Sequence, residues 1–568
     1  MLRWLLRAAI LSRRDGKVIW SMSGLRPPQG DIGIARVRVG VIVGLLGIFG
    51  LLLVALALLA RLGLDTARVP QAASAAALGI FVLAAFMSHG RRPADYYVAD
   101  RDVQPIAGGL ASAAGLAGFF VIALIGGATV TGEIMFAWAL GALVGLVLLA
   151  FLIAPGLRRF GGYTAGDFLA ARFGMRGRLA TSAVALFASL LILLAALKIA
   201  GPLLASLFGL TAEHGLIAAA VLTALTLLPG GFRSVAAAQV AQYLVIALSA
   251  LAPATYLAVR GDDAGPARIA AGSDPGSLLT QLAAPLASAD MSLSALPVLL
   301  VAAGLAALAP MLAPVLAAPS GRAARSTMLW TIGLSLLLLA AGVLLAGALA
   351  GAVGAEGFEE LLADPIAAAL SIASLPSVLS GLITAGALAA LLATAQASLL
   401  SGASSLSHDL WDEMLDRKGP TSRRVFLARL AVAAVAAGAV WLAPSIAMEP
   451  PALLLWALAI AAAGNLAPLL LGLWWPRCNE TGAAYGATAG FLVAGWGFLH
   501  DVGFFPWSEA GAEAGFGAAS AAGIAIAVSF LVAVGVSLMT PAPTRDVEGL
   551  LAQIRSSRGR PVMRERPA

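Results

Sequence analysis

A series of long apolar stretches constrains this chain more than any other feature. A helix needs about 20 consecutive apolar residues to cross the hydrocarbon core of a bilayer. Inside that core only helices and closed barrels satisfy every backbone polar group. The stretches are 41–62, 71–88, 105–130, 133–155, 179–204, 214–229, 235–259, 293–317, 326–350, 376–407, 424–444, 450–475, 481–499 and 515–539. The sequence therefore predicts an all-α polytopic membrane protein with about fourteen transmembrane helices.

The composition agrees with this prediction. Of the 568 residues, 60% are hydrophobic and 11% are charged, which excludes an ordinary soluble domain. The 63 glycines favour close packing between membrane helices. The single cysteine, Cys478, excludes a disulfide framework. The four histidines (His89, His214, His408 and His500) share no ligand spacing, so we expect each to lie in a solvated loop or at an interface.

Charged residues fall mainly between the apolar stretches and predict the orientation of the chain. Cytoplasmic loops of membrane proteins carry an excess of Lys and Arg. Basic residues gather at 158–178 and 417–424, whereas the connection at 356–364, expected on the other side, is acidic. We therefore expect both termini in the cytoplasm and the protein in the cell (inner) membrane. The net charge of +7 then reflects topology and the lipid bilayer, not nucleic-acid binding.

The stretch 376–409 stands apart because polar residues interrupt its middle. These residues are Thr384, Thr394, Gln396, Ser398 and Ser401. Each polar group at mid-depth must find a partner inside the protein. They serve either as hydrogen-bonding contacts between closely packed helices or as the lining of a ligand pathway. The pair His408 and Asp409 at the end of this stretch is expected to cap the helix or to meet lipid headgroups.

Catalytic motifs are missing from the sequence. It contains no Walker-type phosphate loop, no HExxH and no GxSxG. Energy from ATP would then require another subunit, and an ion or solute gradient is the available driving force. We therefore expect a protein that is not an enzyme.

Four segments together resemble one family. They are PADYYVADRDVQPIAGGLASAAG (93–115), GGYTAGDFLAARFG (161–174), GGFRSVAAAQVAQY (230–243) and the stretch 376–409, which ends in SSLSHD. In this order and spacing they resemble the sodium:solute symporter family, and most of all its acetate and short-monocarboxylate permease branch. The resemblance covers roughly 71–555 and leaves the helix at 41–62 as an addition.

The resemblance implies a LeuT-type core of two five-helix inverted repeats. In such folds the first helix of each repeat is broken at mid-membrane. Here 107–118 is rich in glycine and small residues, and Pro310 and Pro314 interrupt 293–317. The expected parts are a basic cytoplasmic N-terminal segment (1–40), two peripheral helices and a loop (41–104), repeat one (105–260), an outer loop (261–290), repeat two (291–475), two C-terminal helices (476–540) and a cytoplasmic tail (541–568).

The family's sodium ion lies between the first and eighth core helices, which are here 105–130 and 376–407. By motif register, three carbonyls and two side-chain positions would hold the ion. These are Ala113, Leu116, Ala390, Ala393 and Thr394. Ala393 stands where the family usually carries serine, and Gly115 where it usually carries aspartate. One direct oxygen and one nearby negative charge are therefore missing.

A second departure concerns the solute. The monocarboxylate branch typically carries a Pro-His pair followed by an arginine in the first helix of repeat two. The corresponding segment here, 308–319, contains no histidine, lysine or arginine. The positions that the resemblance places near the solute are Gly115, Lys198, Gln239, Gln242 and Gln396. Lys198 could instead extend to the outer interface, and each glutamine could instead hydrogen-bond between helices.

Together these observations predict a secondary active transporter. It would move a small organic solute, a short monocarboxylate, across the inner membrane by alternating access. Sodium would be the coupling ion, and a small membrane subunit is a candidate partner. The alternative is a transport-deficient relative that acts as a membrane sensor or an assembly partner. The missing ligands favour this alternative, but the tail after 540 is too short for a folded signalling domain.

Overall fold

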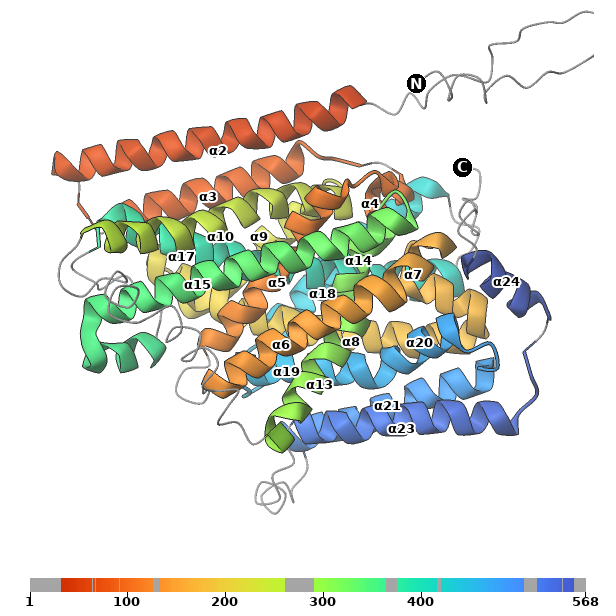
Figure 1. The fold of residues 1–568 in the computed structure, drawn as a ribbon. Helices are drawn as coiled ribbons and strands as arrows, with labels where there is room; N and C mark the ends of the chain where they lie inside the picture. Colours follow the sequence, from red (N-terminus) through yellow and green to blue (C-terminus); the bar gives the residue numbers. More distant parts are fainter. Residues whose placement is uncertain are drawn as a thin grey trace, which may run out of the picture. The chain divides into compact units, whose positions relative to one another are not determined.

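The computed structural model describes residues 32–63, 65–66, 68–90, 92–125, 132–260, 291–363, 375–415, 420–504, 518–543 and 545–555. Every regular element in these ranges is a helix. The chain forms two units, Met1–Leu45 and Leu46–Ala568, and the helix bundle belongs to the second. Within that bundle most helices run roughly along one direction, and α21 and α23 lie side by side (Figure 1).

The elements of the first part of the chain are α2 (Ile32–Arg61), α3 (Arg68–Phe86), α4 (Pro93–Val98), η2 (Ala99–Arg101), α5 (Pro105–Ile125), α6 (Gly132–Leu148), η4 (Leu149–Ile153), α7 (Ala154–Phe160), α8 (Ala165–Phe208), α9 (Ala212–Leu227) and α10 (Phe232–Arg260). The expected outer loop at 261–290 lies outside the described residues.

The second part contains α13 (Met291–Ala307), α14 (Ala309–Ala317), α15 (Gly321–Ala363), α17 (Ser377–Ser404), η5 (Ser405–Leu415), α18 (Thr421–Leu442), α19 (Pro450–Ala461), η6 (Ala462–Leu466), α20 (Ala467–Trp474), α21 (Glu480–Asp501), α23 (Ala518–Met539) and α24 (Arg545–Arg555). The described part of each of the fourteen predicted stretches falls mainly on one of these helices or on a consecutive run of them, and 126–130 and 515–517 lie outside the described residues. Among the described residues, eleven helices are long and apolar enough to cross a membrane, or twelve if α13 and α14 form one bent span. The predicted all-α membrane fold is confirmed.

Helix α17 is packed on several sides. It contacts α5, α8 and α10 of predicted repeat one, α18 of predicted repeat two, and the peripheral helix α3. Its polar side chains Thr384, Thr394, Gln396 and Ser398 are all buried among these neighbours. Small residues make such contacts possible because a helix without bulky side chains lets a second backbone approach closely.

The two predicted helix breaks have different outcomes. Helices α13 and α14 meet at Leu308, whose backbone is extended, and the chain bends there by 42°. Pro310 follows at the start of α14, where its missing N–H costs no helical hydrogen bond. The break expected over 107–118 is wrong, because α5 is helical throughout Pro105–Ile125. Its glycines permit close packing instead: a Cβ on Gly109 would lie 2.5 Å from the Cβ of Trp330 on α15.

Connections predicted to lie on the same side of the membrane meet at one end of the bundle. Arg158 donates hydrogen bonds to the carbonyls that follow α14, with its Nη2 3.0 Å from Pro319 O. Arg172 Nη2 lies 2.7 Å from the carbonyl of Cys478, in the connection after α20. We call this part the arginine-rich end. Three π-helical turns, η4, η5 and η6, also interrupt the long helices. Such turns are frequent at functional sites.

Candidate functional site

The region predicted to hold an ion forms where α5 crosses α17. The buried Thr394 hydroxyl donates a hydrogen bond to the carbonyl of Gly115, at 2.6 Å. Ala113 packs in one buried cluster with Ala393. A Cβ on Gly118 would contact the Thr394 side chain and would lie 2.6 Å from the carbonyl of Ala390. The structure therefore brings together the two segments, 113–116 and 390–394, that the resemblance pairs.

The polar groups of this region already bond one another. Gln239 Nε2, on α10, donates to the carbonyl of Ala393 at 3.0 Å. The same nitrogen lies 3.5 Å from the point that a Cβ on Gly115 would occupy. An amide donor thus lies beside the position where the family usually carries a carboxylate. Among the five predicted ion-binding positions, Thr394 alone has a side-chain oxygen. In this structure its hydroxyl donates a hydrogen bond to the carbonyl of Gly115.

A small cavity lies beside this crossing, between α5, α10, α14 and α17. It encloses about 10 Å³, and its lining includes Ser112, Gly115, Gln239, Pro310 and Met311. None of the described residues that line it is charged. This volume corresponds to about one water molecule, far below the roughly 300–1,000 Å³ of small-molecule pockets. The cavity is therefore too small for an organic solute at the predicted position.

The other predicted solute residues have different surroundings. Gln242 and Gln396 are buried, and neither lines this cavity. Both amide atoms of Gln242, and Oε1 of Gln396, have no hydrogen-bond partner among the residues that the structure describes. Lys198 lies away from the cavity: its Nζ donates to the carbonyls of Ile446 and Met448, at 2.7 and 2.8 Å. The structure thus brings Gly115 and Gln239 together and places Lys198 against the connection between α18 and α19.

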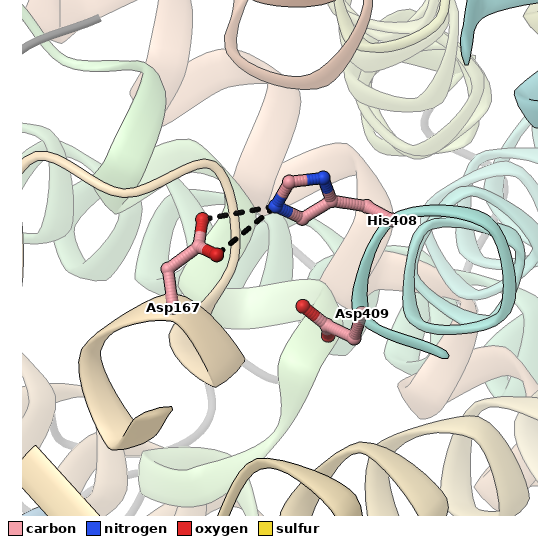
Figure 2. A group of neighbouring side chains, drawn as sticks. All are labelled: Asp167, His408 and Asp409. Atoms are coloured by element: carbon pink, nitrogen blue, oxygen red, sulfur yellow. Dashed lines mark hydrogen bonds and ion pairs between the residues drawn. The ribbon is translucent and has the colours of Figure 1, made fainter. Parts of the chain in front are cut away.

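A second group of polar residues, at the arginine-rich end, is a buried charge cluster of Asp167, Arg178, His408 and Asp409. Each of these side chains is almost completely buried. His408 Nε2 lies 3.0 and 3.1 Å from the two carboxylate oxygens of Asp167 (Figure 2). Arg178 Nη2 donates to Asp167 at 2.8 Å, and its Nη1 lies 3.8 Å from Asp409. The cluster joins the first turns of α8 to the π-helical η5.

Local sequence explains the position of Asp167. It is the third residue of α8 and forms a reciprocal capping box with Thr164. Its carboxylate accepts the backbone N–H groups of Tyr163, at 2.7 Å, and of Thr164, at 3.3 Å. The Thr164 hydroxyl in turn donates to Asp409 at 2.5 Å. One short loop therefore positions a carboxylate of its own and binds a second carboxylate from η5.

Aromatic rings cover the imidazole of His408. The ring centroids of Tyr97 and Tyr163 lie 5.2 and 5.4 Å from that of His408. Tyr97 also shares a 3.0 Å hydrogen bond with Ser407. Burial raises the pKa of the Tyr97 hydroxyl well above its usual value, so this hydroxyl remains neutral at physiological pH.

The sequence did not predict this cluster. The expectation that His408 lies in a solvated loop or at an interface and, with Asp409, caps a helix or meets headgroups is wrong, because each residue is 2% exposed and lies in the interior. The capping box Thr164–Asp167 is visible in the sequence as T-x-x-D before an apolar run. Its contact with a residue 241 positions later has no local signal. Arg178 was counted as a topology signal, although it pairs with Asp167 in the interior.

A second cavity adjoins the charge cluster. Its volume is about 50 Å³, and Asp409 and Thr164 are among its lining residues. Further along it are Ser182 of α8, Ser401 of α17 and Asn465 of the π-helical η6. Ala313 of α14 lines both this cavity and the smaller one. The two cavities therefore share Ala313 as a common lining residue.

The helix bundle, its broken helix pair and its two interior cavities define a membrane transporter. Residues 96–490 match the sodium:solute symporter family, and the chain belongs to that family. The predicted family is thus confirmed, as is the prediction that the protein is not an enzyme.

Known relatives agree with this assignment. An uncharacterized symporter of Cupriavidus necator is 26% identical, over 81% of this chain and 90% of its own. The uncharacterized symporter YwcA of Bacillus subtilis is 27% identical, over 63% of this chain and 71% of its own. A solved Na⁺-coupled sialic acid symporter, in a substrate-bound outward-open state, superposes with a TM-score of 0.68 at 14% identity. It covers 84% of this chain and 98% of its own, and the LeuT-type fold is confirmed.

Proposed function

We propose that this protein is a sodium-coupled symporter that moves a short monocarboxylate across the cell membrane by alternating access. One observation carries the proposal: Gly115, whose carbonyl accepts the Thr394 hydroxyl, and Pro310, two residues after the break at Leu308, line the same small cavity. A gated solute site in this fold requires a discontinuous helix facing a small occluded space. The family and the sialic acid symporter support secondary symport in general.

The solute would bind where α5, α10 and α14 meet. The N-terminal end of α14 carries a partial positive charge, which suits a carboxylate in a site whose described lining is uncharged. Gln239 and Ser112 are the polar side chains among the described residues of the lining, and the Gln239 amide becomes available once it leaves the carbonyl of Ala393. Opening the cavity to solute size requires α14 to move away from α5 and α17. The arginine-rich end would face the cytoplasm.

Sodium would bind at the crossing of α5 and α17. The Thr394 hydroxyl would turn from Gly115 so that its oxygen faces the ion, together with carbonyls of Ala113, Leu116 and Ala390. A hard cation prefers such oxygen ligands. With alanine at 393, water or the carboxylate of the solute would complete the coordination. This arrangement would couple the binding of sodium to the binding of the solute, because the solute carboxylate would supply an oxygen ligand to the ion and the ion would offset the carboxylate's charge.

Uptake into proteoliposomes tests the proposal. We expect radiolabelled acetate, propionate, pyruvate or lactate to accumulate under an inward Na⁺ gradient and not under choline. Thr394→Ala should reduce the Na⁺-driven rate at least tenfold. Thr384→Ala is the matched control, because its hydroxyl bonds only its own helix, at Ser380 O, 3.0 Å away. Full uptake by Thr394→Ala would refute the ion placement. A protein that neither transports these solutes nor is thermally stabilised by them would favour the sensor or assembly alternative.

A further inference from the structure

The turn that follows α4 holds three consecutive residues in a left-handed backbone conformation. Ala99, Asp100 and Arg101 have φ values of 49°, 57° and 57°. Apart from glycines, no other residue in the described part of the chain has a positive φ. In this conformation the Cβ of an L-residue lies too close to the following carbonyl oxygen, so residues other than glycine normally adopt it singly. The turn is therefore strained.

Contacts with two other segments hold the turn in this conformation. The Arg101 guanidinium donates to the carbonyl of Gly161, in the connection between α7 and α8. It also lies over the ring of Tyr163, 5.7 Å from the ring centroid. Just after the turn, the N–H of Val103 donates to the carbonyl of Ala317, the last residue of α14, at 3.4 Å. Strained backbone persists only where its surroundings impose it, and these contacts do so.

The strained turn adjoins the larger cavity, the one of about 50 Å³. Tyr97, two residues before the turn, lines this cavity together with Tyr163 and part of α14. The two tyrosine ring centroids lie 5.8 Å apart, and the Tyr97 hydroxyl shares a 3.0 Å hydrogen bond with Ser407 of η5. A change in the backbone of the turn would therefore move α4 and Tyr97 relative to the cavity.

The larger cavity must widen before an organic solute can pass through it. Its volume of about 50 Å³ is well below the roughly 300–1,000 Å³ of small-molecule pockets. Its lining is nevertheless polar: Ser182 Oγ, Ser401 Oγ and Asn465 Oδ1 are buried and have no hydrogen-bond partner among the described residues. Buried polar atoms nearly always have a partner, so this lining suits a space that opens to polar molecules.

We propose that the left-handed turn Ala99–Arg101 is a strained hinge, which holds α4 and Tyr97 over the larger cavity and relaxes when that cavity opens at the arginine-rich end. Opening separates Arg101 from Gly161 and lets the turn return to negative φ. The strain released offsets part of the contacts that are lost, so the closed and open states lie close in free energy. The inference deepens the proposed alternating access and rests on it, but it depends neither on sodium nor on the identity of the solute.

Paired substitutions at one exposed residue test the strain. Asp100→Gly and Asp100→Ala lose the same ion pair with Arg92, so the two variants differ only in the Cβ. We expect Asp100→Gly to unfold at a higher temperature than Asp100→Ala, the reverse of the usual order in helical segments. Asp102 is the matched control, because it is also exposed but has a φ of −110°. There the glycine variant should not exceed the alanine variant. A higher midpoint for Asp100→Ala than for Asp100→Gly would overturn the proposal.

Labelling of a cysteine inside the cavity tests the hinge. The reporter is Ser182→Cys in a Cys478→Ala background, exposed to a polar maleimide in detergent without Na⁺ or solute. Because glycine favours the left-handed turn, adding Asp100→Gly should give labelling about fivefold slower than adding Asp100→Ala. Arg101→Met removes a contact of the closed state and should speed labelling severalfold.

Two labelling results would overturn the proposal. One is equal rates for Asp100→Gly and Asp100→Ala, which would show that opening leaves the turn unchanged. The other is an Arg101→Met protein that is labelled no faster than its parent. Neither measurement involves transport, so the absence of uptake would refute the proposed function while leaving the hinge result intact.

Discussion

Replacement of Arg178 by methionine tests the energetics of the buried charge cluster. Methionine keeps the length and apolar stem of the side chain and removes the guanidinium that bonds Asp167 at 2.8 Å. Arg178 and Asp167 are both inaccessible to solvent, so water cannot replace the lost partner. The variant therefore leaves two carboxylates in the interior, with His408 as the one neighbouring group able to become positively charged.

The expected loss follows from the partners that remain. Removing one member of a buried ion pair typically costs about 3–5 kcal/mol. Asp167 keeps the N–H of Tyr163, the N–H of Thr164 and His408, so we expect the lower end, about 3 kcal/mol. The double variant Arg178→Met/Asp167→Asn removes the uncompensated charge and should recover more than half of this loss. Such a recovery is the signature of direct coupling between two side chains.

The assay is equilibrium or thermal unfolding of the protein in detergent, with an exposed ion pair as control. Arg68 lies 3.7 Å from Asp65, with 75% and 59% of these side chains exposed. Arg68→Met should change the free energy of unfolding by less than about 0.5 kcal/mol. A loss below about 1 kcal/mol in Arg178→Met would refute the reasoning. So would a double variant no more stable than the single one.

Two further predictions concern packing and reactivity. Gly118→Ala places a methyl group in the contact between α5 and α17, 2.6 Å from the carbonyl of Ala390, and should lower the free energy of unfolding by about 1–3 kcal/mol. Gly333→Ala is the control, because a Cβ there would have no atom within 4 Å and should leave the free energy of unfolding unchanged. Equal stability of the two variants would contradict the close approach of the two helices. Cys478 is buried, and burial raises the pKa of its thiol, so less of it is the reactive thiolate at any given pH. We therefore expect maleimide to label Cys478 only after denaturation. Rapid labelling of the folded protein at pH 7 would contradict its burial.

Hydrophobic length and proline position predicted most of the fold. The polar-centred stretch 376–409 became α17 and η5, and the prolines at 310 and 314 marked the second broken helix. Proline lacks a backbone N–H in any surroundings, so its effect on a helix is local and can be predicted from the sequence. The glycine-rich stretch 107–118 was misjudged, because small residues permit both an unwound segment and close helix contact. The sequence alone does not distinguish these two outcomes.

The sequence predicted the contact between α5 and α17 but neither the surroundings of Lys198 nor the buried charge cluster, because both of these depend on long-range packing. The match to the family's motifs predicted that 113–116 lies next to 390–394, and the structure brings these two segments together. Lys198 matched a family position, yet two carbonyls of a distant connection hold its ammonium group. Asp167 meets His408 across 241 residues of sequence, and Asp409 accepts from Thr164 across 245 residues. Their burial depends on tertiary packing, which no local pattern encodes.

Solute-driven movement of ²²Na⁺ tests the central claim of sodium-coupled symport most directly. Proteoliposomes would hold equal Na⁺ on both sides, and an inward gradient of the transported monocarboxylate would be the only driving force. We predict that ²²Na⁺ accumulates inside together with the solute, and that Thr394→Ala abolishes this accumulation. Solute entry with no net movement of ²²Na⁺ would contradict the account.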